Sequence, residues 1–533
     1  MYLEKGEWQK TFDAVRQASS LQPGYPETLR MQARLLSATG NFVPAAVLWK
    51  QLGSGKIDFQ PNDHRDEAKA AIETGDLPLA DEQMRWLRGK GDDTAADRIL
   101  AARLAERRGD RAGATSFALS ALGAKDTSER DRIAASVLVL MNAVQADQRH
   151  QAWSALDAIG QKKEASGLEA LNYLAAQEVT LLKGDSTLDS ATPIDPELLA
   201  QRLESHPLAK VSDRLHAVDL RLALRPSQRA LLLDDATRRF SKGSRDELTA
   251  LCLWLIGEQE AARVLSVLPN EKAAETKVLS VCRVEALSAL GRWSEVESEL
   301  DSPHSDLKME EITSQLYLVR CAFKLRKKAA LQVRWERAFD LAAGDAAKLL
   351  LVGGEAEHDS SPEIAEKAYR GAIKAQPQDR RAYDALLRLV ARNGAGAAYE
   401  TLAAMAKQWP NDPNILNSEL YAGLLTARLA PEAARAQAEQ LVRQAPADSS
   451  CRATLALSFL KLGQPKAALA AFGNVDDDLK KGHARTSTAI VHAAVLSANG
   501  QEKEARTEAA RISLAGLAPE ERALIAPLLP PGA

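Results

Sequence analysis

Residues 449–475, SSCRATLALSFLKLGQPKAALAAFGNV, hold two short apolar stripes separated by a glycine and a proline. The residues that recur at helical spacing are Leu455, Ala456 and Phe459 in the first half and Ala468 and Phe472 in the second. Between the halves, Gly463 can end one helix in the left-handed conformation, and Pro465 suits the first turn of the next. The stretch therefore predicts a helical hairpin. Two helices of about a dozen residues are marginal in water by themselves, so the hairpin requires neighbours of the same kind.

The hinge of this hairpin recurs along the chain at intervals of 34 or 35 residues. The recurring positions are Gly6, Gly40, Gly75 and Gly109, then Gly257 and Gly291, then Ser360, Gly394, Leu429 and Gly463. A helix–turn–helix period of 34 residues is the signature of the tetratricopeptide repeat (TPR). The chain therefore resembles a TPR array over almost its whole length. The resemblance implies an all-α fold, a right-handed α-solenoid (superhelix) of about 14–15 TPR-like hairpins. Between Gly109 and Gly257 the spacing stretches, and Asp147 and Gly184 are the expected hinges.

Composition supports a helical array and argues against several other classes. The chain has 533 residues, 45% hydrophobic but only 5% aromatic, which favours helices packed through small residues. The formal net charge is −3, so no chain-wide basic field favours a nucleic acid, and we expect none as a partner. The four cysteines are far apart within apolar segments, which indicates buried small side chains and neither a disulfide framework nor a metal site. The Ala-rich composition favours a bacterial source.

The repeat pattern divides the chain into four parts. These are an N-terminal array (1–184), an irregular loop and degenerate repeat (185–244), a C-terminal array (245–515) and a capping helix with a Pro-rich tail (516–533). The first array begins in mid-repeat, because residues 1–6 read as the last turn of a first helix. We therefore expect further sequence upstream, which can include a targeting signal or an anchor.

The TPR resemblance also implies which residues line the concave face. The residues at the family's groove positions, or offered as an aromatic anchor, are Arg320, Lys324, Arg381, Arg388, Arg392 and Trp409. Arginine offers paired donors to carboxylates, so the set predicts a mildly basic groove for a protein or peptide with acidic groups. The alternative for the cations is an ordinary solvated helix face, and the alternative for the tryptophans is core packing.

Motifs of catalysis fail on inspection, so we expect no enzyme activity, no cofactor and no metal. Gly53–Lys56 resembles the end of a phosphate loop, but Ile57 stands where Ser or Thr is needed. Gly394 and Gly396 begin a dinucleotide-like GxGxxG pattern that ends in Tyr399 and follows a helix instead of a strand. His358 lies in an acidic cluster that could attract a cation, although a solvated helix end explains it as well.

The function that follows is a non-enzymatic, monomeric scaffold that binds a partner segment in the concave groove. One alternative is the soluble arm of a membrane-anchored envelope assembly or export factor, with its anchor upstream. Another is the regulatory region of an enzyme whose catalytic domain lies outside the chain. A cytoplasmic location is the default and membrane anchoring the alternative.

Overall fold

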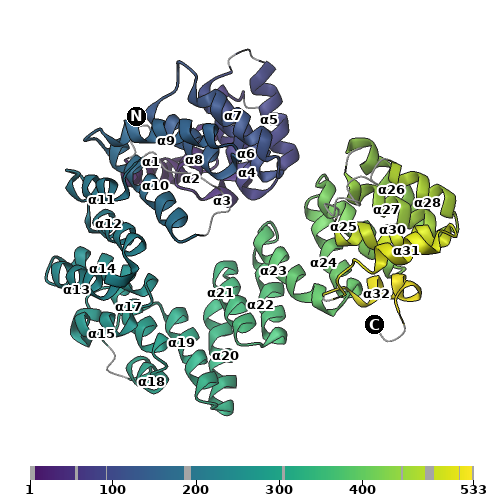
Figure 1. Ribbon diagram of the computed structural model, residues 1–533. Coiled ribbons are helices and arrows are strands. Elements are labelled where there is room, and N and C mark those ends of the chain that lie inside the picture. The colour runs from purple at the N-terminus through teal and green to yellow at the C-terminus, as the bar shows by residue number, and fades with distance from the viewer. Residues whose placement is uncertain are drawn as a thin grey trace. The chain divides into compact units, whose positions relative to one another are not determined.

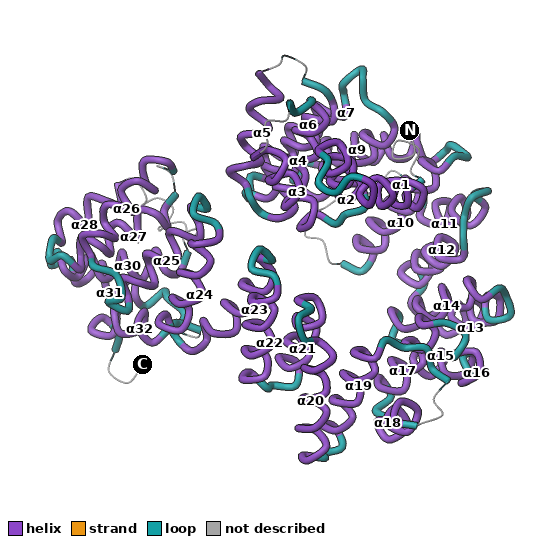
Figure 2. Tube along the Cα trace, turned by 180° about the vertical axis from the view of Figure 1, so that it is seen from behind, coloured by secondary structure: helices purple, strands orange, loops and turns teal. Residues whose placement is uncertain are grey.

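The computed structural model describes residues 7–54, 58–89, 91, 93–184, 194–302, 306–445, 448–473, 485–514 and 516–530. Contacts divide the chain into two compact units, Met1–Lys327 and Lys328–Ala533. Within the described residues both units consist of helices joined by short loops, without a strand (Figure 2). The expected all-α helical-repeat fold is confirmed.

The first unit contains nineteen described α-helices and one short 3-10 helix (Figure 1). They are α1 (Trp8–Leu21), α2 (Pro26–Ala38), α3 (Phe42–Ser54), α4 (Pro61–Thr74), α5 (Leu77–Gly89), α6 (Ala95–Arg107), α7 (Arg111–Leu122), α8 (Glu129–Asn142), α9 (Ala146–Gly160), α10 (Ala165–Leu182), α11 (Pro196–Ser205), α12 (Val211–Leu224), η1 (Pro226–Gln228), α13 (Arg229–Phe240), α14 (Arg245–Gly257), α15 (Ala261–Val267), α16 (Asn270–Ala273), α17 (Lys277–Ala289), α18 (Trp293–Asp301) and α19 (Glu311–Lys324).

The second unit continues with helices of similar length. They are α20 (Lys328–Ala342), α21 (Ala346–His358), α22 (Pro362–Ala375), α23 (Arg380–Val390), η2 (Ala391–Asn393), α24 (Ala395–Gln408), α25 (Pro413–Leu425), α26 (Pro431–Gln444), α27 (Ser449–Lys461), α28 (Pro465–Phe472), α30 (Thr486–Ala498), α31 (Glu502–Ala509), α32 (Pro519–Ile525) and η4 (Ala526–Leu528).

Within each unit most helices pack against their successors, and the first helix of one hairpin also packs against the first helix of the next. In the first unit, this second kind of contact joins α2, α4, α6, α8, α10, α12, α14 and α17 in series. In the second unit it joins α25, α27, α30 and α32. The apolar stripe of each hairpin is therefore buried mainly by the adjacent hairpin, as a solenoid requires.

Small side chains let the helices approach closely. In the α6–α7 hairpin, the contacting alanines Ala102, Ala114, Ala118 and Ala121 have no exposed surface. Large side chains fill the remaining gaps, and Trp49 and Trp153 are almost wholly buried. In the hairpin formed by α27 and α28, the stripe residues Ala456, Ala468 and Phe472 are buried as the sequence predicts. The four cysteines are buried thiols, also as predicted.

The hinges between paired helices share one backbone geometry. At ten of them a residue with positive φ follows the helix, and the next N–H donates to the carbonyl five residues before it. This is the helix-ending arrangement in which glycine is favoured. The left-handed residues are Gly40, Gly75, Gly109, Gln259, Gly291, Arg326, Ser360, Ala427, Gly463 and Gly500.

Comparison with the expected hinge positions shows where a glycine pattern succeeds and fails. Ser360 is confirmed as a hinge, with φ of 54°. The expected hinges Gly257 and Leu429 lie two residues from the true ones, Gln259 and Ala427. Asp147 is wrong, because it lies in the first turn of α9. Helix α8 there ends through Ala143 in extended backbone, which needs no glycine. Gly6 lies outside the described residues.

The segment expected to be irregular, 185–244, contains α11, α12 and α13 from residue 196 onward, while residues 185–193 are outside the described part. How the chain divides into functional domains stays a prediction. Among the described residues, none of the helices combines the length and apolarity that crossing a bilayer demands.

We predict that Gly463→Ala lowers the free energy of unfolding of the surrounding hairpins by about 1 kcal/mol. Gly463 has φ of 71° and no atom within 4 Å of an added Cβ, so the effect comes from backbone strain alone. The measurement is urea denaturation followed by circular dichroism. Gly257→Ala is the matched control, because Gly257 is helical with equally open surroundings, and alanine there should be neutral or stabilising. Equal effects of the two changes would contradict the hinge interpretation.

Candidate functional site

A cavity of about 890 Å³ lies along α2 and beside the first turns of α4 and α6 in the first unit. Arg30 and Arg34 come from one face of α2, since residues four apart share a helix face. Arg65 projects from α4, Trp86 from the end of α5, and Thr94 caps α6. The cavity therefore crosses three consecutive repeats and presents guanidinium groups beside an aromatic ring.

The α2 arginines are tied to carboxylates of the next first helix. Arg30 Nε lies 3.3 Å from Asp63 Oδ2, and Arg34 Nε lies 3.3 Å from Asp66 Oδ2. The Asp63 side chain is almost fully buried and also accepts the Gln60 N–H at the start of α4. These ion pairs bridge adjacent repeats, so the positive charge facing the cavity is largely compensated.

The same arrangement is repeated one unit later. Arg65 donates from Nε and Nη2 to the two oxygens of Asp97, at 2.8 and 2.9 Å. Asp97 also takes part in the capping box of α6, where it accepts the Thr94 N–H at 3.2 Å and the Thr94 hydroxyl at 2.6 Å. Burial alone would raise the pKa of Asp97, but the bonds from Arg65 and Thr94 outweigh it and hold that pKa below its usual value.

Four aromatic rings line up beneath this cavity. Phe59 meets Trp49 edge-on at 5.7 Å and His64 at 5.4 Å between ring centroids. His64 stacks on Trp86 at 3.6 Å, and its Nδ1 lies 2.5 Å from the Gln83 side-chain oxygen. Trp86, which lines the cavity, is therefore held in position by packing and hydrogen bonding behind it.

A buried carboxyl group lies on the same helix α4. Glu67 is only 5% exposed, and burial raises its pKa to about 7, with the negative charges of Glu82, Asp76 and Asp63 adding to the effect. At neutral pH this carboxyl group is partly protonated.

Sequence inspection assigned no site residue to this region, although a signal was present. Arg30 and Arg34 precede Asp63 and Asp66 by 33 and 32 residues, close to one repeat period. Opposite charges separated by one period face each other on adjacent first helices. Opposite charges spaced by about one repeat period are therefore the sequence signal for these inter-repeat ion pairs.

The expected groove residues Arg320 and Lys324 lie on α19 of the first unit. The Arg320 guanidinium is half-buried over the Tyr317 ring at 5.3 Å from its centroid. The exposed Lys324 ammonium lies 5.7 Å from the centroid of Phe323, whose side chain is itself 38% exposed. Both cations thus cover aromatic rings of their own helix.

The other expected cations lie on α23 and η2 in the second unit. Arg381 forms a fork with Asp379, the residue that caps its own helix, at 2.7 and 2.9 Å. Arg388 Nη2 is 3.5 Å from Glu357. Arg392 is exposed in η2. Two of these three charges are therefore compensated, and a partner-binding role for the set stays a prediction.

Trp409 follows α24 and is half-buried. Its ring meets Tyr383 edge-on at 5.3 Å, and the Arg380 guanidinium lies 5.9 Å from its centroid. Arg380 in turn binds Asp412 at 2.8 Å. The ring thus packs between α23 and the loop after α24, and its role as an anchor for a partner stays a prediction.

A second cavity of the first unit, about 670 Å³, follows one face of α10 and is mainly apolar. Tyr173 and Leu208 line it and are 39% and 50% exposed. Glu169 and Lys210 supply one charge of each sign. The cavity suits an apolar side chain of a partner.

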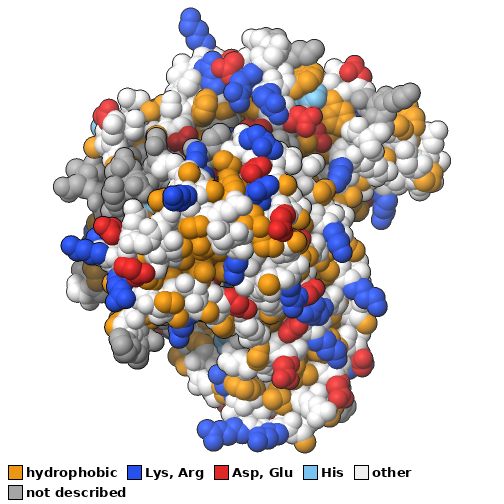
Figure 3. Space-filling view, turned by 90° about the vertical axis from the view of Figure 1, so that its right-hand side faces the viewer, with side chains coloured by type: hydrophobic (Ala, Val, Ile, Leu, Met, Phe, Trp, Pro, Cys, Tyr) orange, Lys and Arg blue, Asp and Glu red, His pale blue; other side chains and the backbone are white. Residues whose placement is uncertain are grey.

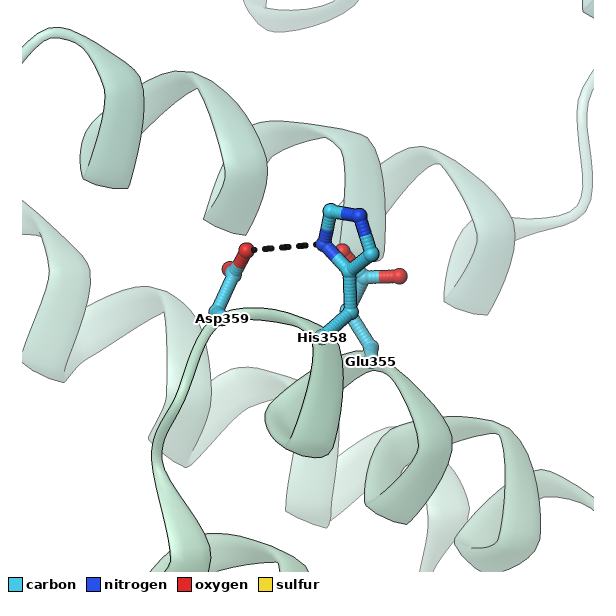
Figure 4. A group of neighbouring side chains, drawn as sticks. All are labelled: Glu355, His358 and Asp359. Atoms are coloured by element: carbon cyan, nitrogen blue, oxygen red, sulfur yellow. Dashed lines mark hydrogen bonds and ion pairs between the residues drawn. The ribbon is translucent and has the colours of Figure 1, made fainter.

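The acidic cluster around His358 forms the end of α21 (Figure 4). Oxygens of Glu355 and Asp359 and a ring nitrogen of His358 lie within 4.8 Å of one another, and His358 Nδ1 is 3.3 Å from Asp359. Both carboxyl groups are buried and have further interactions. The group lies at the C-terminal end of a helix, where His358 contacts the neighbouring carboxylate, and this geometry assigns no metal.

No known family model matches the chain, and no curated protein matches it. Among solved structures, an APC/C hetero-tetramer, Cut9–Hcn1, is similar over 97% of this chain and 98% of that chain, with 16% identity and a TM-score of 0.28. The pentatricopeptide repeat protein PPR10 from maize is similar over 99% and 80%, with 14% identity and a TM-score of 0.35. The described residues of this chain form a helical-repeat fold.

One partner expectation for this helical-repeat protein needs correction. Nucleic acid was excluded on net charge, but PPR10, with a helical-repeat fold, is also similar in its complex with an 18-nt psaJ RNA element (13% identity, TM-score 0.36, 99% of this chain and 80% of that one). A formal charge of −3 is spread over a long surface, so it does not decide what a single groove binds.

We predict that stability falls as pH rises from 5 to 8 because of Glu67. A carboxyl group whose folded pKa is about 7 keeps its proton while the unfolded group, near 4.5, loses it. The loss should be roughly 2 to 3 kcal/mol by pH 8. Glu67→Gln should remove most of this slope, as measured by urea unfolding at several pH values.

Glu82→Gln is the graded control for this experiment. It removes one of the charges that raise the pKa of Glu67, so the slope should shrink without disappearing. An unchanged slope in Glu67→Gln would show that another group carries the pH dependence.

Proposed function

We propose that this protein is a non-enzymatic interaction scaffold that holds an extended segment of a partner protein along the first helices of its first unit. The observation that carries the proposal is the 890 Å³ cavity, which crosses three consecutive repeats. Its walls come from first helices, which lie next to one another in TPR-like proteins. Stacking on His64 holds the Trp86 ring in place, and the ion pair with Asp97 holds the Arg65 guanidinium.

The charges of the cavity support a polypeptide ligand. The arginines are paired with Asp63, Asp66 and Asp97, so the wall offers donors and acceptors in alternation. A polypeptide backbone can satisfy both kinds of group, whereas a polyanion gains most from uncompensated cations. In the face of the molecule seen in Figure 3, positive and negative side chains are likewise interspersed among hydrophobic ones. RNA is the competing outcome of the test.

Pairing of the ionisable groups also supports a role without chemistry. Glu27 binds Arg30, Asp93 binds Arg98, and Asp126 accepts the N–H of Ala95. In the described part of the wall, these carboxylates therefore form ion pairs with neighbouring arginines or accept a backbone N–H at a helix end. Acid–base or nucleophilic catalysis instead requires a group directed at a reacting atom.

The test is site-specific photo-crosslinking in cells of the source organism. A benzophenone amino acid replaces Met31, which lines the cavity on α2. We predict a protease-sensitive adduct at this position, and Met31→Arg should reduce recovery of the adducted protein about tenfold in pull-downs from the same cells.

The matched control places the same crosslinker, or arginine, at the exposed residue Gln51 on α3. It should give little adduct and leave recovery unchanged. A nuclease-sensitive adduct at position 31 would replace the protein partner by RNA, and equal adducts at both positions would rule out this cavity as the binding surface.

A further inference from the structure

The C-terminal helix α32 packs against the hairpin that precedes it and also meets helices of the second unit far from it in sequence. It packs on α30, and Ile525 and Leu528 are buried in the core formed with α30 and α31. Leu524 also packs against the apolar cluster that joins α25, α26, α27, α28 and α30. The apolar side of α32 is therefore held mainly by the α30–α31 hairpin.

The acidic first turn of α32 meets the N-terminus of α24, more than a hundred residues earlier. Glu520 accepts the N–H of Ala395 at 3.0 Å and that of Gly396 at 3.4 Å. These N–H groups lie at the positive end of a 14-residue helix, where the first turn offers them no partner within the helix itself. Burial would raise the pKa of Glu520, but the backbone donors lower it, so the carboxylate is charged at neutral pH.

The backbone at Gly394 is shaped to receive this carboxylate. Gly394 has φ of 113°, a region that L side chains rarely adopt, and an added Cβ would lie 3.1 Å from Glu520 Oε2. A Cβ at Gly396 would approach Glu520 and the Arg428 guanidinium at 3.8 and 4.0 Å. The two glycines that suggested a nucleotide motif in the sequence thus form a carboxylate cradle.

A second carboxylate is recognised beside the first. The Tyr421 hydroxyl of α25 donates to Glu521 Oε1 at 2.9 Å, while the other oxygen of Glu521 accepts the N–H of Ala518 at 3.1 Å. The Tyr421 residue is half-buried at this place. The second unit therefore reads two adjacent glutamates and, one turn later, the apolar pair Leu524 and Ile525.

We propose that this surface is a docking site for a short amphipathic protein helix that begins with two carboxylates, and that α32 is its internal occupant. The site comprises the α24 N-terminus, Tyr421 and the apolar residues of α30 and α31 that bury Ile525 and Leu528. It deepens the proposed scaffold role, on which it rests, by giving a second binding position and the chemistry of its ligand.

The occupant can be exchanged, because α32 has only seven residues. So short a helix is marginal without its seat, and its advantage over a partner helix is its tether, which raises its local concentration. A partner with the same pattern and more contacts would displace it. Binding to this site would therefore be inhibited by the C-terminus until such a partner is present.

The test uses the full-length chain and a fluorescein-labelled peptide of residues 517–530. Glu520→Gln/Glu521→Gln weakens the internal helix and leaves the site intact. We predict that the peptide binds this variant at least about tenfold more tightly than the parent, by fluorescence anisotropy. Adding Gly394→Ala should remove the gain, and a peptide with both glutamates changed to glutamine should fail to bind.

Glu502→Gln/Glu504→Gln on α31 is the matched control and should behave as the parent. Circular dichroism checks folding, and the single variant Glu520→Gln is used if the double variant loses helix. Equal peptide affinity in parent and variant, or equal binding of the glutamine peptide, overturns the proposal. The assay contains no cellular partner, so its result is independent of the crosslinking at Met31.

Discussion

Every hairpin of this protein has an apolar stripe that it cannot bury alone, and the stacking of hairpins follows from that constraint. The buried residues are mainly alanines and leucines at the contacts between neighbouring helices, such as Ala102 and Ala118. A core divided in this way has no centre, so stability is distributed along the chain as a series of nearest-neighbour contacts. The inter-repeat ion pairs of Asp63 and Asp97 add directional ties to these contacts.

The proposed binding surfaces differ in how far their residues also hold the repeats together. In the first unit, the cavity between repeats is lined by groups that also hold the repeats together. Binding and repeat alignment are therefore coupled there, because a ligand that moves Arg65 disturbs the α4–α6 contact. In the second unit, the recognition groups are mainly backbone N–H donors and a tyrosine hydroxyl. Release of α32 from them would leave the contacts that join α25, α27 and α30 in place.

The fold could be predicted because the period and the stripes are local properties of the sequence. Gly463 and Ser360 were placed correctly, since a helix must end within a residue or two of the repeat boundary. Asp147 failed because α8 ends in extended backbone, which leaves no residue signature. The candidate sites were harder to predict. The compensation of Arg381 by Asp379 depends on a side-chain rotamer, and the meeting of Glu520 with Gly394 depends on the curvature accumulated over several hairpins.

The contact between α32 and α24 has a consequence for how the gene can change. Solenoids commonly gain or lose repeats by duplication, because each new unit needs only its neighbours. Between Gly394 and Glu520 that freedom is restricted, since one more hairpin would carry the two glutamates away from their donors. We infer that the contact of Glu520 with the α24 N-terminus fixes the number of hairpins between α24 and α32.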